Sequence, residues 1–257
     1  IDPERLKEYL LYGYVPSPYT LFKNIRRLPG GHFQWLDVRK YQLSKTEAYW
    51  DLPLDPETLN IPYKEAQEEV RRLISQAVKK RLIADVPLGC FLSGGLDSSI
   101  IAFEASRLLN GKVLKTFSAG FTYDSRSQEF DETPYAQEVA RQIQSQHLTM
   151  QIDAAKVNPL PIMLHFDEPF ADSSAIPTDL LCEKTSEQVK VALSGDGGDE
   201  LFGGYLRFRA ALMSEKHKYI FKLLLSPINL DSGSPRSLIG FVNRFKKALD
   251  QPLLQRL

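Results

Sequence analysis

Two short segments of the chain place glycine, serine and aspartate directly after apolar runs. The first, residues 93–98, reads SGGLDS and follows the apolar run from Val86 to Leu92. Glycine lets a backbone approach a ligand closely, and the start of a following helix presents free N–H groups and a positive dipole end. Ser93 and Ser98 can add hydroxyl donors to phosphate oxygens. This segment predicts a phosphate-binding turn between a strand and a helix.

Asp97 lies inside this turn, where a carboxylate repels phosphate unless a cation lies between them. Mg²⁺ is a cation that binds carboxylates and phosphates together. The alternative is a tight turn in which Asp97 only stabilises the start of the helix. The spacing matches neither a Walker A loop nor the dinucleotide fingerprint, which disfavours a kinase or P-loop NTPase.

The second segment, residues 194–200, reads SGDGGDE and follows another apolar run. The carboxyl ends of parallel strands meet at a crevice where the strand order reverses. Asp97 and Asp199, each following a different strand, could therefore share one magnesium ion. The alternatives are an acidic surface loop or a calcium loop, although the acid spacing of a calcium loop is absent.

Hydrophobic periodicity alternates between helix and strand types from Pro62 onward. We expect helices at residues 66–84, 96–109, 134–144, 154–165 and 177–188, strands at 86–92, 113–121, 147–152 and 189–193, and helices after Gly204. Alternation of this kind predicts an α/β fold with a doubly wound parallel sheet, followed by a helical C-terminal part. Residues 1–57 differ: turn residues are dense, and we expect a helix at 5–11, a hairpin at 32–50 and a connector role.

Composition excludes several classes of protein. Lys+Arg and Asp+Glu both number 32, so the formal net charge is zero, and the balance indicates no overall basic surface for nucleic-acid or membrane binding. Small basic clusters at residues 217–218 and 244–247 are either a local basic face or, as favoured here, solvated helix faces. No stretch approaches the ~18 apolar residues of a membrane span. Two cysteines, Cys90 and Cys182, form no disulfide framework and favour a reducing compartment, the cytoplasm.

The first segment resembles the pyrophosphate loop of the PP-loop ATP pyrophosphatases, and the second narrows the resemblance. Residues 193–205, LSGDGGDELFGGY, are similar to the asparagine synthetase (glutamine-hydrolysing) family, as are residues 116–121 (TFSAGF), 167–169 (DEP) and 12–32. The resemblance covers residues 6–205 and weakens in the tail. It implies that residues 1–57 are the end of a glutaminase domain plus a linker. Residues 58–257 would be a synthetase domain truncated at its C-terminus, within a longer protein.

The resemblance also implies roles for individual residues. Leu92 and Ala119 would contact adenosine, and Ser194 and Gly195 would lie beside the α-phosphate and ribose. The pyrophosphate loop comprises Ser93, Gly94, Gly95 and Ser98, with Asp97 also contacting ATP; Asp97 and Asp199 are the implied magnesium ligands. Asp196 lies where the family places an acid implicated in forming the acyl-adenylate, although many members have Glu there.

The reaction implied is adenylation of a carboxylate by ATP, with aspartate favoured, followed by attack of ammonia to give an amide and AMP. A glutaminase domain in the same protein is the implied ammonia source, and a homodimer is compatible with the family. The glutaminase nucleophile is an N-terminal cysteine that neither Cys90 nor Cys182 can supply. A catalytic lysine is expected beyond Leu257, so the fragment alone could be inactive.

The sequence leaves several interpretations of individual residues and of the function open. Residues 172–177 (DSSAIP) resemble a broader amidotransferase pattern, so the acceptor could be another carboxylate, such as a sugar acid or peptide in envelope biosynthesis; the same residues could equally cap a helix. Asp131 and Glu132 are interpreted as favouring a helix start. The four histidines lack ligand spacing and are interpreted as structural. A non-catalytic nucleotide-binding domain is a further alternative, whereas RNA modification would need basic patches and paired cysteines.

Overall fold

The computed structural model describes residues 1–52, 59–121, 131–153 and 157–217. The chain divides into two compact units. The first contains Ile1–Gly95 and Ile101–Ser194, and the second contains Leu96–Ile100 and the chain from Gly195 onward. Each unit is described by itself. The expected domain boundary at residues 57/58 falls at the edge of 53–58, outside the described residues, and stays a prediction.

The first unit is built on a four-stranded parallel sheet. Its strands are β5 (Leu88–Phe91), β6 (Lys115–Phe121), β7 (Gln146–Ile152) and β8 (Val191–Leu193). The spatial order is β7-β6-β5-β8, and every pairing is parallel. Strands β6 and β7 therefore lie in succession on one side of β5, and β8 lies on its other side. The expected α/β class is confirmed. Strand β5 begins after Pro87, later than expected, because proline has no N–H for the ladder.

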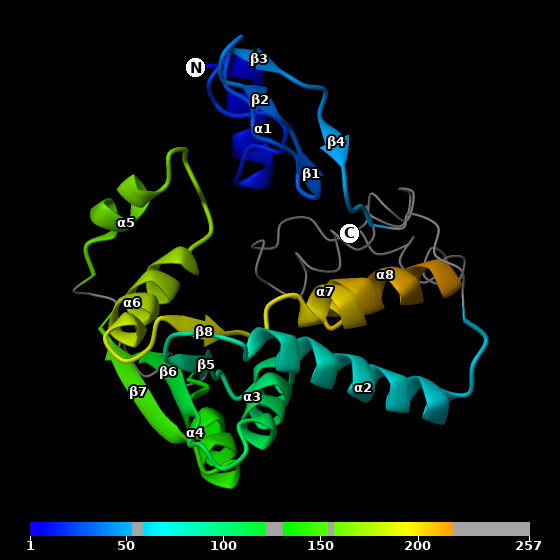
Figure 1. The fold of residues 1–257 in the computed structure, drawn as a ribbon, viewed down its shortest axis with the longest axis vertical. Helices are drawn as coiled ribbons and strands as arrows, with labels where there is room; N and C mark the ends of the chain where they lie inside the picture. The colour runs from blue at the N-terminus through cyan, green and yellow to red at the C-terminus, as the bar shows by residue number, and fades with distance from the viewer. Residues whose placement is uncertain (53–58, 122–130, 154–156, 218–257) are drawn as a thin grey trace, which may run out of the picture. The chain divides into compact units, whose positions relative to one another are not determined.

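Helices cover both faces of this sheet (Figure 1). They are α2 (Tyr63–Arg81), the part of α3 (Leu96–Leu108) from Ile101 onward, α4 (Thr133–Gln142) and α6 (Ala175–Ser186). Helix α5 (Pro159–His165) packs against α6 instead. Right-handed crossovers place α3 and α4 on one face, and the reversal to β8 places α6 on the other. A buried cluster joins α2, α3 and α4 to the strands; it contains Val78, Cys90, Leu92, Ala102, Ala105, Leu114, Ala136 and Ala140. The start of the expected 154–165 helix lies outside the described residues.

The N-terminal part contains the expected helix and hairpin. Helix α1 (Pro3–Tyr12) begins where the Asp2 carboxylate accepts a hydrogen bond from the Glu4 amide, and it ends at Gly13 in the left-handed region. Strands β1 (His32–Phe33) and β4 (Glu47–Ala48) pair antiparallel, and β2 (Leu36–Asp37) and β3 (Gln42–Leu43) pair between them in sequence. Two nested ladders thus form the predicted hairpin.

The second unit contains the first turn of α3 together with α7 (Gly198–Phe202) and α8 (Leu206–Lys216). Helix α8 confirms helical structure after Gly204; the expectation for residues 218–257 lies outside the described part of the chain. Within that part, no helix combines the length and the apolar character that crossing a bilayer requires.

Candidate active site

The two glycine-rich segments begin at the carboxyl ends of neighbouring strands. Cys90 of β5 pairs with Leu193 of β8, so Ser93 and Ser194 follow strands that lie about 4.8 Å apart. These are the strands between which the chain order reverses. Ligands of open parallel sheets bind at such reversals. In the first unit, the sheet therefore brings the starts of both predicted segments to one edge.

Gly94 has a backbone conformation and a close packing contact that only glycine can accommodate. Its φ is +85°, and a Cβ there would lie 2.5 Å from the Tyr135 Cβ and 2.6 Å from the Ala136 amide nitrogen of α4. The Ser93 hydroxyl oxygen accepts a hydrogen bond from the Gly95 amide at 3.1 Å. The turn is thus held closed by Ser93 and packed tightly against α4 by Gly94.

A cavity of about 410 Å³ opens at this edge of the sheet. It lies at the carboxyl ends of β5 and β6 and at the starts of α4 and α6, and it is lined by Phe91, Leu92, Ser93, Phe117, Ser118, Ala119, Glu132, Thr133, Ser174, Pro177, Thr178 and Leu181. The structure thus brings together Leu92, Ser93 and Ala119, which lie in separate parts of the sequence. Its apolar lining with a few hydroxyl groups suits a flat heterocycle.

Three residues that line this cavity, Thr133, Thr178 and Leu181, lie outside every motif that the sequence analysis singled out. Thr133 and Thr178 stand on two helix starts that converge only in the fold, and no local pattern marks them. Glu132, interpreted as a helix-start residue, lines the cavity. Its neighbour Asp131 does favour the helix start, because its carboxylate accepts a hydrogen bond from the Thr133 amide at 3.1 Å.

The segment before α6 forms a local turn at the helix start, and its acceptor-binding role stays a prediction. The Asp172 carboxylate accepts a hydrogen bond from the Ser174 amide at 2.9 Å, and this bond lowers the pKa of Asp172. Ser174 occupies the N-cap position of α6 without a capping bond from its side chain, and it lines the cavity. Local turn chemistry therefore sets the position of a cavity residue.

In the second unit, residues of the first turn of α3 pack against the second glycine-rich segment. A Cβ at Gly195 would lie 2.6 Å from the Ser98 amide nitrogen. A Cβ at Gly198 would lie 2.7 Å from both carboxylate oxygens of Asp97. Glycine at 195 and 198 lets Asp97 and Ser98 approach the backbone of the second segment closely. The phosphate role of Ser98 and the metal role of Asp97 stay predictions.

The other two predicted acids of this unit are arranged differently. The Asp199 carboxylate lies against Gly204, and Asp196 is exposed. The described residues contain no group of three or more His, Cys, Asp or Glu side chains placed to hold a metal ion. Mg²⁺ is commonly held by only one or two carboxylates plus substrate phosphates and water. Asp97 beside Gly198 fits such a site, and the shared ligation by Asp199 stays a prediction.

Two other reactive side chains have structural surroundings. Burial raises the pKa of the Cys90 thiol to about 12, so it is not a nucleophile at neutral pH. His147 Nδ1 lies 2.9 Å from the Thr116 hydroxyl and its Nε2 lies 3.2 Å from the Ser118 hydroxyl, and burial lowers the pKa of this imidazole. The ring connects β7 to β6 behind the cavity residue Ser118.

Comparison with known proteins identifies the family. The family model described as asparagine synthase matches residues 69–254. This chain belongs to the asparagine synthase family. The match includes both glycine-rich segments, the four-stranded sheet and α6, so the resemblance inferred from the sequence motifs is confirmed.

Individual relatives agree with this assignment. The chain is 37% identical to a putative glutamine-hydrolysing asparagine synthetase 2 of Methanocaldococcus jannaschii, over 80% of this chain and 39% of the relative. It is 36% identical to the glutamine-hydrolysing asparagine synthetase 1 of Bacillus subtilis, over 82% of this chain and 32% of the relative. The chain thus spans about a third of the length of these synthetases. The fungal amidase chyE of Penicillium rubens is 32% identical over 76% of the chain.

Among solved structures, an NH3-dependent NAD synthetase from Campylobacter jejuni aligns with 75% of this chain and 98% of its own. Its sequence identity is 13% and its TM-score is 0.31, so it adds nothing to the family assignment.

Proposed function

We propose that the asparagine synthase-like protein to which this chain corresponds uses ATP to adenylate a small carboxylate, aspartate in the first instance, and then forms an amide with ammonia. The supporting observation is that the two glycine-rich segments begin, at Ser93 and Ser194, after the neighbouring strands β5 and β8, where the strand order reverses. The adjacent cavity, lined by Leu92 and Ala119, is where the adenosine would bind. Family membership supports ATP-dependent amide synthesis in general.

The chain's own residues would do the work of binding and orientation. The turn formed by Ser93, Gly94 and Gly95 would hold the departing pyrophosphate through backbone N–H groups and the start of α3. Ser98, Ser194 and Gly195 would contact the phosphates and ribose. Asp97, with Asp199, would hold magnesium, which when bound neutralises charge on the phosphates. Asp196 would act in forming the acyl-adenylate.

The reaction splits one difficult step into two. A carboxylate is a poor electrophile, and transfer of AMP makes its oxygen part of a good leaving group while pyrophosphate departs. Ammonia then attacks the carbonyl carbon, forms the C–N bond, loses a proton and releases AMP. In the whole protein, a glutaminase domain would supply the ammonia, the cytoplasm would be the compartment, and a homodimer would be the assembly to test by sedimentation.

The decisive assay measures AMP and pyrophosphate formed by the full-length protein with ATP, Mg²⁺, aspartate and ammonia. AMP formation that depends on aspartate, and its loss in Asp97→Ala, is the expected result. Unchanged turnover of Asp97→Ala at saturating magnesium would contradict the role of Asp97.

A second candidate is an amidotransferase with another acceptor. It is favoured by the DSSAIP sequence at residues 172–177, of which Ser174 and Pro177 line the cavity. AMP formation with other acids but not with aspartate would support this candidate. Nucleotide binding without AMP formation for any acid would instead indicate a non-catalytic domain.

A further inference from the structure

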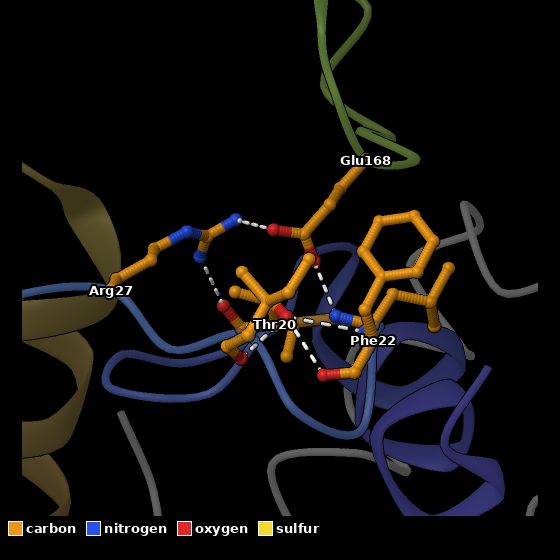
Figure 2. A network of polar contacts seen from close by, with 7 residues as sticks. Thr20, Phe22, Arg27 and Glu168 are labelled. Carbon is orange, nitrogen blue, oxygen red and sulfur yellow. Dashed lines mark hydrogen bonds and ion pairs between the residues drawn. The ribbon is translucent and has the colours of Figure 1, made fainter.

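The Glu168 carboxylate joins two distant parts of the first unit (Figure 2). One of its oxygens accepts a hydrogen bond from the Leu21 amide at 2.5 Å, and the other accepts one from the Arg27 guanidinium at 2.6 Å. The Glu168 side chain is only 11% exposed. Both oxygens therefore bind the N-terminal connector, from a position about 140 residues further along the chain.

Arg27, the N-terminal partner of Glu168, lies in a segment that is held by its own hydrogen bonds. Arg27 donates a second hydrogen bond to the Val15 carbonyl at 2.8 Å, and the Thr20 hydroxyl donates to the Ile25 carbonyl at 2.8 Å. Val15, Thr20 and Leu21 are buried, at 2%, 5% and 6% exposure. Arg27 thus reaches Glu168 from a segment whose own conformation is fixed by internal bonds, as Figure 2 shows.

A backbone bond extends the same contact toward the cavity. The Ala171 amide donates to the Gly13 carbonyl at 3.0 Å, and a Cβ added at Gly13 would lie 3.4 Å from the Ala171 Cβ. The chain therefore meets the connector at Glu168 and again at Ala171. Three residues later it reaches Ser174, whose amide is held by Asp172.

Ser174, Pro177 and Thr178 form the part of the cavity wall that α6 contributes. A short helix start on a loop is free to shift unless its approach is fixed, because loop residues otherwise sample many conformations. Here the approach is fixed by the connector, through the carboxylate of Glu168. This is a link between residues 13–27, called the connector clasp below, and one wall of the nucleotide cavity.

We propose that Glu168, through Arg27, is a positioning residue that holds the α6 wall of the cavity for the nucleotide, so that the connector clasp controls ATP affinity. The proposal rests on the proposed function for the identity of the ligand. In this proposal the DEP sequence at residues 167–169 couples the connector clasp to the α6 wall of the cavity. Glu168 itself does not contact the reacting atoms.

The test compares Glu168→Gln, Arg27→Met and the double variant in the full-length protein. Glutamine keeps the size of Glu168 and one acceptor but removes its charge. The matched control is Glu69→Gln, which removes the partner of Arg72 in an exposed i,i+3 ion pair on α2. The measurements are the KM for ATP and kcat at saturating acceptor and ammonia, the Kd of a fluorescent ATP analogue, and the unfolding temperature.

Each single variant should raise the KM and Kd for ATP roughly tenfold, the loss expected for one charge-assisted hydrogen bond, with little change in kcat. The double variant should lose less affinity than the sum of the two single losses, because both single variants break the shared bond between Arg27 and Glu168. Arg27→Lys, which keeps the charge, should recover part of the affinity. Glu69→Gln should bind ATP as the parent does.

Unchanged ATP affinity in folded Glu168→Gln and Arg27→Met, with only a lower unfolding temperature, would overturn the proposal, because Glu168 would then be merely structural. Additive losses in the double variant would also overturn it. If Glu168→Gln does not fold, the ATP affinities of Arg27→Met and Arg27→Lys alone decide whether the ion pair between Arg27 and Glu168 positions the cavity wall. A parent protein that binds ATP but forms no AMP contradicts the proposed reaction, and the binding comparison still decides the role of Glu168.

Discussion

Gly195→Ala tests whether the second glycine-rich segment must pack directly on the start of α3. A Cβ at residue 195 would lie 2.6 Å from the Ser98 amide nitrogen and 2.9 Å from the Asp97 carbonyl carbon, whereas ordinary contacts of a Cβ begin at 3.4 Å. The atoms in the way belong to the backbone, so they cannot rotate aside as a flexible side chain can. The added methyl group must strain this packing or displace one of the two segments.

Overpacking of this kind costs about 1–3 kcal/mol. If the strain is retained in the folded state, the unfolding temperature should fall by about 2–12 °C, at about 2–4 °C per kcal/mol for a chain of this size. If the segments separate instead, the same free energy appears as ATP affinity weaker by about 5- to 140-fold, at about 1.4 kcal/mol per tenfold. Thermal unfolding and titration with a fluorescent ATP analogue measure the two outcomes.

Gly30→Ala is the matched control, because no heavy atom lies within 4 Å of a Cβ added there. It should leave the unfolding temperature and the ATP affinity unchanged. If Gly195→Ala behaves like Gly30→Ala in both measurements, the close packing of residues 195 and 97–98 is not needed and the reasoning is refuted.

Two further predictions concern Cys90, which is buried, and His147, which is half-buried. Iodoacetamide at pH 8 should label Cys182, which is exposed, although partial burial and the neighbouring Asp179 raise its pKa. It should leave Cys90 unlabelled, because this thiol is buried and its pKa is raised to about 12. Peptide mass spectrometry measures the labelling of each cysteine, and labelling of Cys90 in folded protein would contradict the prediction. Burial lowers the pKa of His147 below its ordinary value of 6.5. Below pH 6.5 the imidazole therefore binds a proton more readily in the unfolded chain than in the folded one. The free energy of unfolding accordingly decreases as the pH is lowered. His147→Gln should reduce this fall between pH 7.5 and 5.5 in urea unfolding; an equal fall in both proteins would exclude His147 as its source.

Local patterns were sufficient to predict the sheet and the glycine-rich turn that follows β5. Strands β5, β6, β7 and β8 were all expected near their observed positions, because apolar runs between turn residues reflect burial directly. Leu92 and Ala119 were named from motifs and do line one cavity. These features depend on short stretches of sequence, which is why they could be predicted.

The remaining features depend on contacts between distant residues. Glu168 was recognised only as part of a motif, and its role became visible when Leu21 and Arg27 appeared beside it. Asp131 and Glu132 were both interpreted as favouring the helix start, and both lie there, with Glu132 at the N-cap of α4. That Glu132 also lines the cavity depends on the fold. The side-chain direction of Asp199, against Gly204, likewise depends on local rotamers that no spacing rule specifies.

The pairing of β5 with β8 has a consequence for how the protein is made. Leu88 pairs with Val191, so the ribosome must add roughly a hundred residues after β5 before its second neighbour exists, and such long-range pairing is intrinsically slow. Until then, the β8 side of β5 stays an open edge that other chains can pair with. A nascent polypeptide stalled between α4 and α6 should therefore be the species most prone to aggregate and most dependent on chaperones.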